Sequence, residues 1–226
     1  MMELTMFERL LQLPLFQGLT TQEVSDVMSH VRLNFVNYHA GDEVVLQGDT
    51  CRNLIYIITG ELKAEYHDEK GRFTLYEHLP NMKVLEPFNM FGMYQKFSRT
   101  YLFDTDGITL SIEKPVVLRQ LLVNDIIKIN LLNIICNRYQ QTQQLLCHDA
   151  GTSVARKIVR FIESYAILAK GKKELKMKMT ELADLIQETR INVSIALNSM
   201  QEKGLIVLRR GIITVNDLQE LHRAYQ

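Results

Sequence analysis

The sequence predicts an α+β protein with a β-rich N-terminal domain, a long central helix and a C-terminal winged helix-turn-helix. Short β-type runs separated by turn residues fill residues 33–122, and residues 124–147 contain neither Gly nor Pro. The last third of the chain has the order helix, helix, helix, β-hairpin. The predicted domains are therefore 1–123 for a β-roll with N-terminal helices, 124–149 for the long helix and 150–226 for the winged domain.

The composition of the chain is that of a globular protein. Its 226 residues are 46% hydrophobic, enough for one large domain or two ordinary domains with cores of their own. Lys plus Arg and Asp plus Glu number 26 each, so the formal net charge is zero and excludes attraction of the whole chain to a polyanion. A nucleic-acid signal must be local, and residues 153–178 supply one with eight Lys or Arg against two Glu.

The cysteines and the N-terminus indicate a cellular compartment. Cys51, Cys136 and Cys147 are too few and too scattered for a disulfide framework, and none has zinc-site spacing. The N-terminal stretch lacks the ordered segments of a signal peptide, and no run approaches the roughly 20 apolar residues of a membrane span. We therefore expect a reduced, cytoplasmic protein with no membrane partner and no metal site.

The N-terminal half combines two short helices with a series of strands. Helical spacing over residues 3–30 is broken by Pro14 and Gly18, which predicts the two helices. The predicted strand segments are NFVNY, VVLQ, LIYIITG, LKAEYH, FTLYEHL, ITLSI and VVLRQL. Their regular spacing is typical of an antiparallel barrel or roll.

The segment 124–147 predicts a helix of roughly 36 Å at 1.5 Å per residue. Its apolar positions form two adjacent series at steps of three and four, Ile127, Leu131, Ile134, Leu145 and Leu132, Ile135, Tyr139, Thr142, Leu146. So broad a face can pack on its own domain and on a second chain; an ordinary buried core helix is the alternative. Residues 149–152 break the pattern, which predicts a boundary and hinge near residue 150.

The C-terminal region has the element order of a winged helix-turn-helix. The predicted elements are a helix over 152–169, a run LKMKM, helices over 180–188 and 190–202, and two strands, LIVL and IITV, joined by Arg209-Arg210-Gly211. Thr180 and Thr189 are the predicted N-caps of the last two helices. In the second of these, Val193, Leu197 and Met200 point inward.

The remaining faces of that helix carry the residue types that DNA recognition uses. Arg can form two hydrogen bonds with guanine, Asn can pair with adenine, and hydroxyls and helix N-terminal amides reach phosphates. The predicted DNA-contacting residues are Thr180, Thr189, Arg190, Asn192, Ser194, Asn198, Arg209 and Arg210. Each of them alone is an ordinary surface residue, but their ordered combination favours DNA binding.

This layout resembles the Crp/Fnr family of regulators over nearly the whole chain. The segments HAGDEVVLQGD and LIYIITGELKA are similar to the first half of a cyclic-nucleotide-binding β-roll, and TELADLIQETRINVSIALNSMQEKGLI is similar to the family helix-turn-helix. By this match Arg190 takes the place of the family's main base-reading arginine. Ile191 and Ile195 stand where family members usually carry a Glu and a second Arg, which implies a different target sequence.

The resemblance also locates a candidate effector site. The family cassette has Phe-Gly-Glu followed by Arg-Ser/Thr, whereas this chain has Phe91-Gly92-Met93 and then Arg99-Thr100. Met93 cannot accept a ribose hydroxyl as Glu does, so we expect an effector other than cyclic AMP. The effector-pocket candidates are Gly92, Met93, Arg99, Thr100, Tyr139 and Thr142.

The resemblance leaves the cofactor unknown. An iron–sulfur cluster is disfavoured, because it needs about four cysteine ligands and the N-terminal segment has none. Haem stays open because some relatives sense haem. Its candidate ligands are His30, His39, His67, His78, His148 and the Met residues of 82–93, with no diagnostic spacing among them.

Together these features predict a homodimeric, sequence-specific DNA-binding transcription regulator. Its β-roll would sense a ligand or redox signal and reposition the recognition helices on a near-palindromic site with half-sites roughly 34 Å apart. RNA polymerase is a further expected partner. The alternative is an effector-binding regulatory module that acts through protein contacts rather than DNA. The sequence has no GxSxG, P-loop or HExxH motif, so we expect no enzyme.

Overall fold

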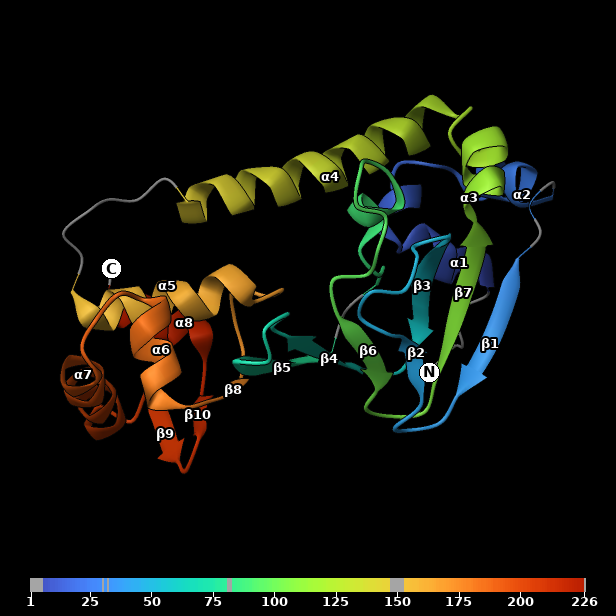
Figure 1. The fold of residues 1–226 in the computed structure, drawn as a ribbon. Coiled ribbons are helices and arrows are strands. Elements are labelled where there is room, and N and C mark those ends of the chain that lie inside the picture. Colours follow the sequence, from blue (N-terminus) through green and yellow to red (C-terminus); the bar gives the residue numbers. More distant parts are fainter. Residues whose placement is uncertain (1–5, 30, 32, 81–82, 147–152, 226) are drawn as a thin grey trace. The chain divides into compact units, whose positions relative to one another are not determined.

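The computed structural model describes residues 6–29, 31, 33–80, 83–146 and 153–225. Contacts between residues divide the chain into two compact units, which Figure 1 shows with their elements labelled. The N-terminal unit comprises Met1–Leu62 and Pro80–Gln141, and the C-terminal unit comprises Lys63–Leu79 and Thr142–Gln226.

The N-terminal unit begins with the two short helices that the sequence predicts, α1 (Met6–Leu11) and α2 (Thr21–Ser29). Between them the 3-10 turn η1 (Pro14–Phe16) starts at the proline. Helix α2 is capped reciprocally, because Thr20 Oγ1 accepts from the Glu23 amide at 3.2 Å and the Thr20 amide donates to the Glu23 carboxylate at 2.7 Å.

Two groups of antiparallel strands follow in the N-terminal unit. Strands β1 (Asn34–Tyr38), β7 (Gly107–Glu113) and β3 (Asn53–Thr59) lie side by side in that order (Figure 1), and β2 (Glu43–Val45) pairs with β6 (Thr100–Phe103). Along β7, Leu110 and Ile112 are completely buried on one face, so the alternating side chains of Thr109 and Ser111 point to the other. Strand β6 was not predicted from the sequence.

The predicted strand VVLRQL is wrong. Residues 114–121 form helix α3 (Lys114–Val116) and a π-helical turn, η3 (Val117–Leu121). Pro115 lies in the first turn of α3, where a backbone N–H has no partner within the helix, so its missing N–H costs no hydrogen bond. In a strand the same missing N–H would leave a hydrogen bond of the sheet unformed. Val117 and Leu121, four residues apart, are both buried, so helical spacing decides the conformation of this β-branched segment.

The predicted long helix is confirmed as α4 (Asp125–Leu146). Asn124 caps it by accepting from the amides of Ile126 and Ile127 at 2.9 and 3.2 Å. The first apolar series of the helix is turned inward, with Ile127 and Leu131 buried. The second is turned outward, with Leu132 55% exposed and Tyr139 63% exposed. The predicted break at 149–152 lies outside the described residues.

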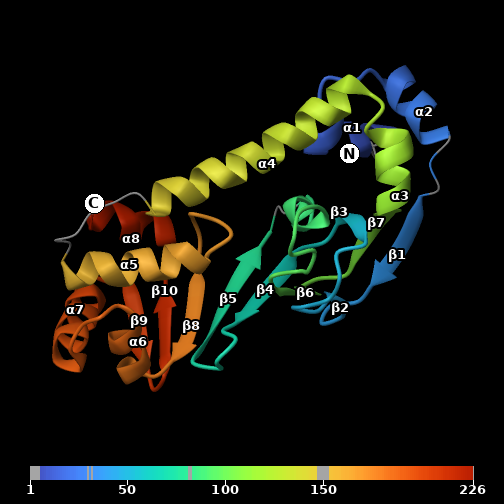
Figure 2. The same cartoon turned by 45° about the horizontal axis from the view of Figure 1, so that its top comes forward.

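The C-terminal unit is one antiparallel sheet covered by helices. Figure 2 shows its strands side by side in the order β4 (Leu62–His67), β5 (Phe73–Leu79), β8 (Lys173–Met177), β10 (Ile212–Val215) and β9 (Ile206–Arg209). Its helices are α5 (Val154–Tyr165), α6 (Met179–Leu185), α7 (Arg190–Glu202) and α8 (Leu218–Ala224). The predicted order of three helices and a β-hairpin wing is confirmed. None of the helices in the described ranges is both long and apolar enough to cross a membrane.

The hairpin β4–β5 is an unpredicted part of this unit. Strand β5 pairs with β8 over five residue pairs, from Phe73 opposite Met177 to Glu77 opposite Lys173. Phe73 and Leu75 are buried in the core that the C-terminal helices form. Four aromatic rings with centroids 4.8 to 5.7 Å apart add to this contact, those of Tyr66, Phe73, Phe161 and Tyr165.

A buried ion pair joins the same two strands. The Lys173 ammonium lies 2.9 Å from the Glu77 carboxylate, and both side chains are 0% exposed. The carboxylate also accepts from the amides of Ile167 at 2.7 Å and Leu168 at 3.3 Å, while Lys173 donates to the Lys170 carbonyl at 2.9 Å. Lys173 therefore contributes nothing to the surface charge of the basic segment 153–178.

Candidate nucleic-acid interface and ligand cavity

Helix α6 is the first helix of the helix-turn-helix, and it begins one residue earlier than the sequence predicts. Its N-cap is Lys178, whose amide donates to the Glu181 carboxylate at 3.0 Å. Thr180 is therefore an exposed residue of the first helical turn, and its predicted capping role is wrong. Glu181 satisfies the amide of Lys178, so the helix needs no Thr180 cap.

The turn between α6 and α7 orients the second helix. Gln187 has a φ of +55°, a left-handed conformation that costs a non-glycine residue roughly 1–2 kcal/mol. The Glu188 amide donates back to the Ala183 carbonyl at 2.9 Å. The chain then enters α7 through Thr189, whose hydroxyl accepts from the Asn192 amide at 3.2 Å. The predicted Thr189 N-cap is confirmed.

Helix α7 is held to its unit by one face. Val193, Leu197 and Met200 are buried, as their spacing predicts. The helix ends in a Schellman motif, in which Gly204 has a φ of +72° and the Leu205 amide donates to the Met200 carbonyl at 3.1 Å. The opposite face of α7 is thereby fixed toward solvent.

The outer face of α7 presents a mixture of polar and apolar side chains. Arg190 is exposed, and its guanidinium forms no hydrogen bond or ion pair with any residue in the described part of the chain. Beside it Ile191 is 71% exposed and Ile195 is 64% exposed. Asn198 is also exposed, whereas Ser194 is half-buried. The outer face of α7 therefore combines an unpaired guanidinium with two exposed isoleucines.

Asn192 has a positioning contact at the start of α7. The side-chain amide of Asn192 donates to the Glu188 carboxylate at 3.4 Å. The Lys157 ammonium donates to the same carboxylate at 2.6 Å. These contacts lower the pKa of Glu188, with the Lys157 hydrogen bond as the main cause. Lys157 is thus neutralised by Glu188 rather than free to contact a phosphate.

The wing is the hairpin β9–β10. Arg209 pairs with Ile212, so Arg210 and Gly211 form a two-residue connection, in which Gly211 has a φ of +72°. Arg209 and Arg210 are both exposed. The tip of the wing therefore presents two cations to solvent.

The six effector-pocket candidates do not gather around one cavity. Gly92 is exposed and Met93 is 92% exposed. Arg99 and Thr100 are buried, and the Thr100 hydroxyl accepts from the Gln47 amide at 3.0 Å. Tyr139 and Thr142 are exposed on α4, and Thr142 belongs to the C-terminal unit.

A buried carboxylate organises the segment that carries four of these candidates. Glu86 accepts from the Asn89 side chain at 2.6 Å, from the Ser98 amide at 2.7 Å, from the Ser98 hydroxyl at 2.6 Å and from the Tyr101 hydroxyl at 2.9 Å. These contacts use the acceptor sites of the carboxylate and fix the chain on both sides of Met93. The segment is therefore held by its own hydrogen bonds.

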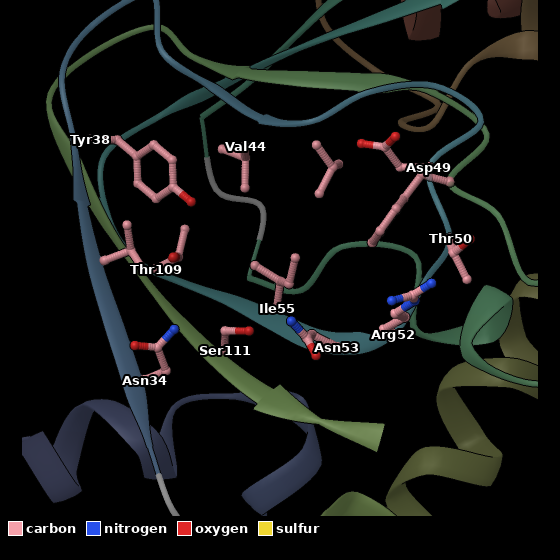
Figure 3. A pocket seen from close by; sticks show the side chains of 13 residues that line it. Asn34, Tyr38, Val44, Asp49, Thr50, Arg52, Asn53, Ile55, Thr109 and Ser111 are labelled. Carbon is pink, nitrogen blue, oxygen red and sulfur yellow. The ribbon is translucent and has the colours of Figure 1, made fainter. Parts of the chain in front are cut away.

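A separate cavity of about 530 Å³ lies in the N-terminal unit between β1, β7, β3 and β2. Figure 3 shows Arg52, Thr50 and Asp49 on one side of it and Tyr38, Thr109 and Asn34 on the other. None of the six predicted effector residues lines it. The sequence gives no signal for these residues, because their common face forms only when β1, β7 and β3 pair.

The histidine and cysteine candidates are dispersed where they are described. His39 lies 3.7 Å from Asp106, and His67 lies 3.1 Å from the Thr74 hydroxyl. Within the described ranges, no group of three or more His, Cys, Asp or Glu side chains could hold a metal ion. Cys51 is buried, which raises the pKa of its thiol to about 11. His30, Cys147 and His148 lie outside the described residues.

The comparison with protein families decides what the C-terminal unit is. Residues 153–224 match the Crp-like helix-turn-helix domain. This stretch of the chain, from α5 to α8, is therefore a Crp-like helix-turn-helix domain. Helix-turn-helix domains of this kind place their second helix in the DNA major groove.

Several solved structures of transcription regulators match the chain at low sequence identity. The Thermus thermophilus catabolite activator protein is 18% identical, with a TM-score of 0.48, over 94% of this chain and all of that chain. DNR from Pseudomonas aeruginosa is 17% identical, with a TM-score of 0.44, over the full length of both chains. The regulator CLP of Xanthomonas campestris, described as c-di-GMP responsive, is 17% identical over 87% of this chain, with a TM-score of 0.44. None of the curated proteins matches the sequence significantly.

Proposed function

We propose that the protein is a homodimeric transcription regulator that binds a near-palindromic DNA site through α7 and the wing, and that a signal received by the β-roll repositions the two recognition helices. The exposed, unpaired guanidinium of Arg190 at the start of α7 carries this proposal. Arg209 and Arg210 at the wing tip supply contacts to flanking phosphates. RNA polymerase is a further proposed partner of the DNA-bound form.

The outward face of α4 supports the homodimer. Ile129, Leu132 and Tyr139 are exposed large apolar residues at helical steps of three and seven. The inward face is already used, since Ile127 and Leu131 are buried and Asn130 donates to the Leu15 and Gln17 carbonyls at 3.0 and 2.8 Å. A second copy of α4 would cover the outward face by knobs-into-holes packing.

The signal is proposed to be a ligand rather than thiol oxidation at Cys51. Burial raises the pKa of this thiol to about 11, so the reactive thiolate is scarcer at neutral pH than in an exposed cysteine. Hairpin β4–β5 is a physical link for the response. It continues the chain of the N-terminal unit at both ends, yet it pairs with β8 of the DNA-binding unit.

Selection from randomised duplex DNA followed by fluorescence anisotropy tests the proposal. The selected sites should be near-palindromic, with half-site centres about 34 Å apart. Raising salt from 50 to 200 mM should weaken binding about 100-fold if about four phosphates are neutralised per dimer. A single unpaired half-site would contradict the homodimer. Failure to enrich any site, with no salt-dependent affinity, would favour the module that acts through protein contacts.

The isoleucines of α7 predict a role for thymine methyl groups in the selected site. Apolar side chains at base-reading positions contact the thymine C5-methyl group, and the exposed side chains of Ile191 and Ile195 are suited to this contact. Replacing one contacted thymine by uracil removes only that methyl group and should weaken binding about fourfold. At the position where uracil weakens binding of the wild-type protein, Ile195→Ala should bind the thymine and uracil duplexes with equal affinity. Full tolerance of uracil by the wild-type protein would contradict this assignment.

A further inference from the structure

We propose that the cavity of the β-roll binds a small anionic metabolite that also carries hydroxyl or amino groups, with Arg52 as the residue that holds its acidic group. This inference rests on the proposed sensing function and names the chemical class of its effector. The site is distinct from the segment around Met93, none of whose four candidates lines the cavity.

Strand register explains how the sequence builds the wall of the cavity. Asn34 of β1 and Ile55 of β3 both pair with Ser111 of β7, so the three side chains form a row on one face of the sheet. Thr109 lies two residues along β7 on the same face (Figure 3). The opposite face of β7 carries Leu110 and Ile112, which are buried in the core.

The polar groups of this wall have unused hydrogen-bonding capacity. The side chains of Asn34, Asn53, Thr109 and Ser111 form no hydrogen bond with another residue in the described ranges. A ligand that replaces water in the cavity can therefore form hydrogen bonds with these side chains. The volume of about 530 Å³ is that of a small-molecule site. Apolar side chains such as Val36, Ile55 and Phe97 would cover the carbon skeleton of the ligand.

The charges at one end of the cavity set the sign of the ligand. Arg52 is the only basic residue among the described residues that line it, and its guanidinium forms no ion pair with any of them. Asp49 is the only acidic lining residue, and one of its oxygens already accepts from the Leu46 amide at 2.9 Å. Arg52 is therefore free to hold a carboxylate or phosphate, and the second Asp49 oxygen can accept from a hydroxyl or amino group.

Equilibrium dialysis of the full-length protein against a polar metabolite extract, read by mass spectrometry, tests this site. The wild-type protein should retain one or a few anionic compounds, and Arg52→Gln should bind them about 10- to 100-fold more weakly. The matched control is Arg119→Gln, which removes the same charge from an exposed residue that does not line the cavity. It should retain the compounds as wild type does.

A second variant separates site occupancy from charge alone. Ser111→Leu adds an apolar side chain beside Ile55 and Asn34 and should abolish retention by filling the cavity. Circular dichroism and thermal unfolding without metabolites establish that each variant is folded. Retention of no compound, of neutral or cationic compounds only, or equal retention by wild type and Arg52→Gln would overturn the proposal. These outcomes leave DNA binding untouched, because the selection and salt experiments need no effector from the extract.

Discussion

Arg190→Ala is expected to weaken binding of the regulator to its selected site by about 10- to 100-fold per half-site. A bidentate arginine–guanine contact contributes roughly 1–3 kcal/mol of discrimination, and this guanidinium has no partner in the described part of the protein that could hold it away from DNA. Arg190 is the first residue of α7, after the Thr189 cap, so alanine should leave the helix intact. Anisotropy titrations at constant salt, on the selected site and on an unrelated duplex, measure the effect.

Two further variants separate base reading from charge. Arg190→Lys keeps the charge but loses the planar fork, so it should retain non-specific binding and lose most of the preference for the selected site. Arg223→Ala removes an exposed arginine of α8 and should leave that preference unchanged. If Arg190→Lys binds the selected site as wild type does, Arg190 contacts only phosphate, and the base-reading assignment fails.

Helix α7 was predictable from sequence because its signals are local. The Thr189 hydroxyl caps an amide three residues away, and Gly204 ends the helix by its own conformation. Inward positions three and four residues apart also need no knowledge of the rest of the fold. The preference for Thr as an N-cap gave the wrong start for α6. That helix begins earlier, at a cap in which the Lys178 amide donates to the Glu181 carboxylate.

The cavity and the hairpin contact could not be predicted, because both depend on residues far apart in sequence. The Glu77 carboxylate accepts from the Ile167 amide across 90 residues, and nothing near either residue indicates the other. The alternating pattern of strand β5 is typical of a strand in the β-roll. It does not predict which strand pairs with β5 or which helices cover its apolar face. Asn34 and Ser111 likewise become part of one site only through the pairing of β1 with β7.

Glu77→Leu is expected to lower the free energy of unfolding of the C-terminal unit by about 3–5 kcal/mol. The substitution leaves the Lys173 ammonium buried without its counter-charge, and it removes the acceptor of the Ile167 and Leu168 amides. Because the chain has no Trp, urea unfolding is followed by far-UV circular dichroism. Hydrogen exchange at the amides of Ile167 and Leu168 reports the local loss of protection.

The double variant Glu77→Leu with Lys173→Met distinguishes the buried charge from the strand contact as a whole. It removes both charges and should recover a large part of the lost free energy, since apolar residues can replace a buried ion pair with little loss. The two amides would still lack their acceptor, so their exchange should stay fast. If Glu77→Leu alone unfolds as wild type does, strands β5 and β8 are not held together by this pair. The proposed link between sensing and DNA binding would then rest only on the pairing of β5 with β8 and on the packing of Phe73 and Leu75.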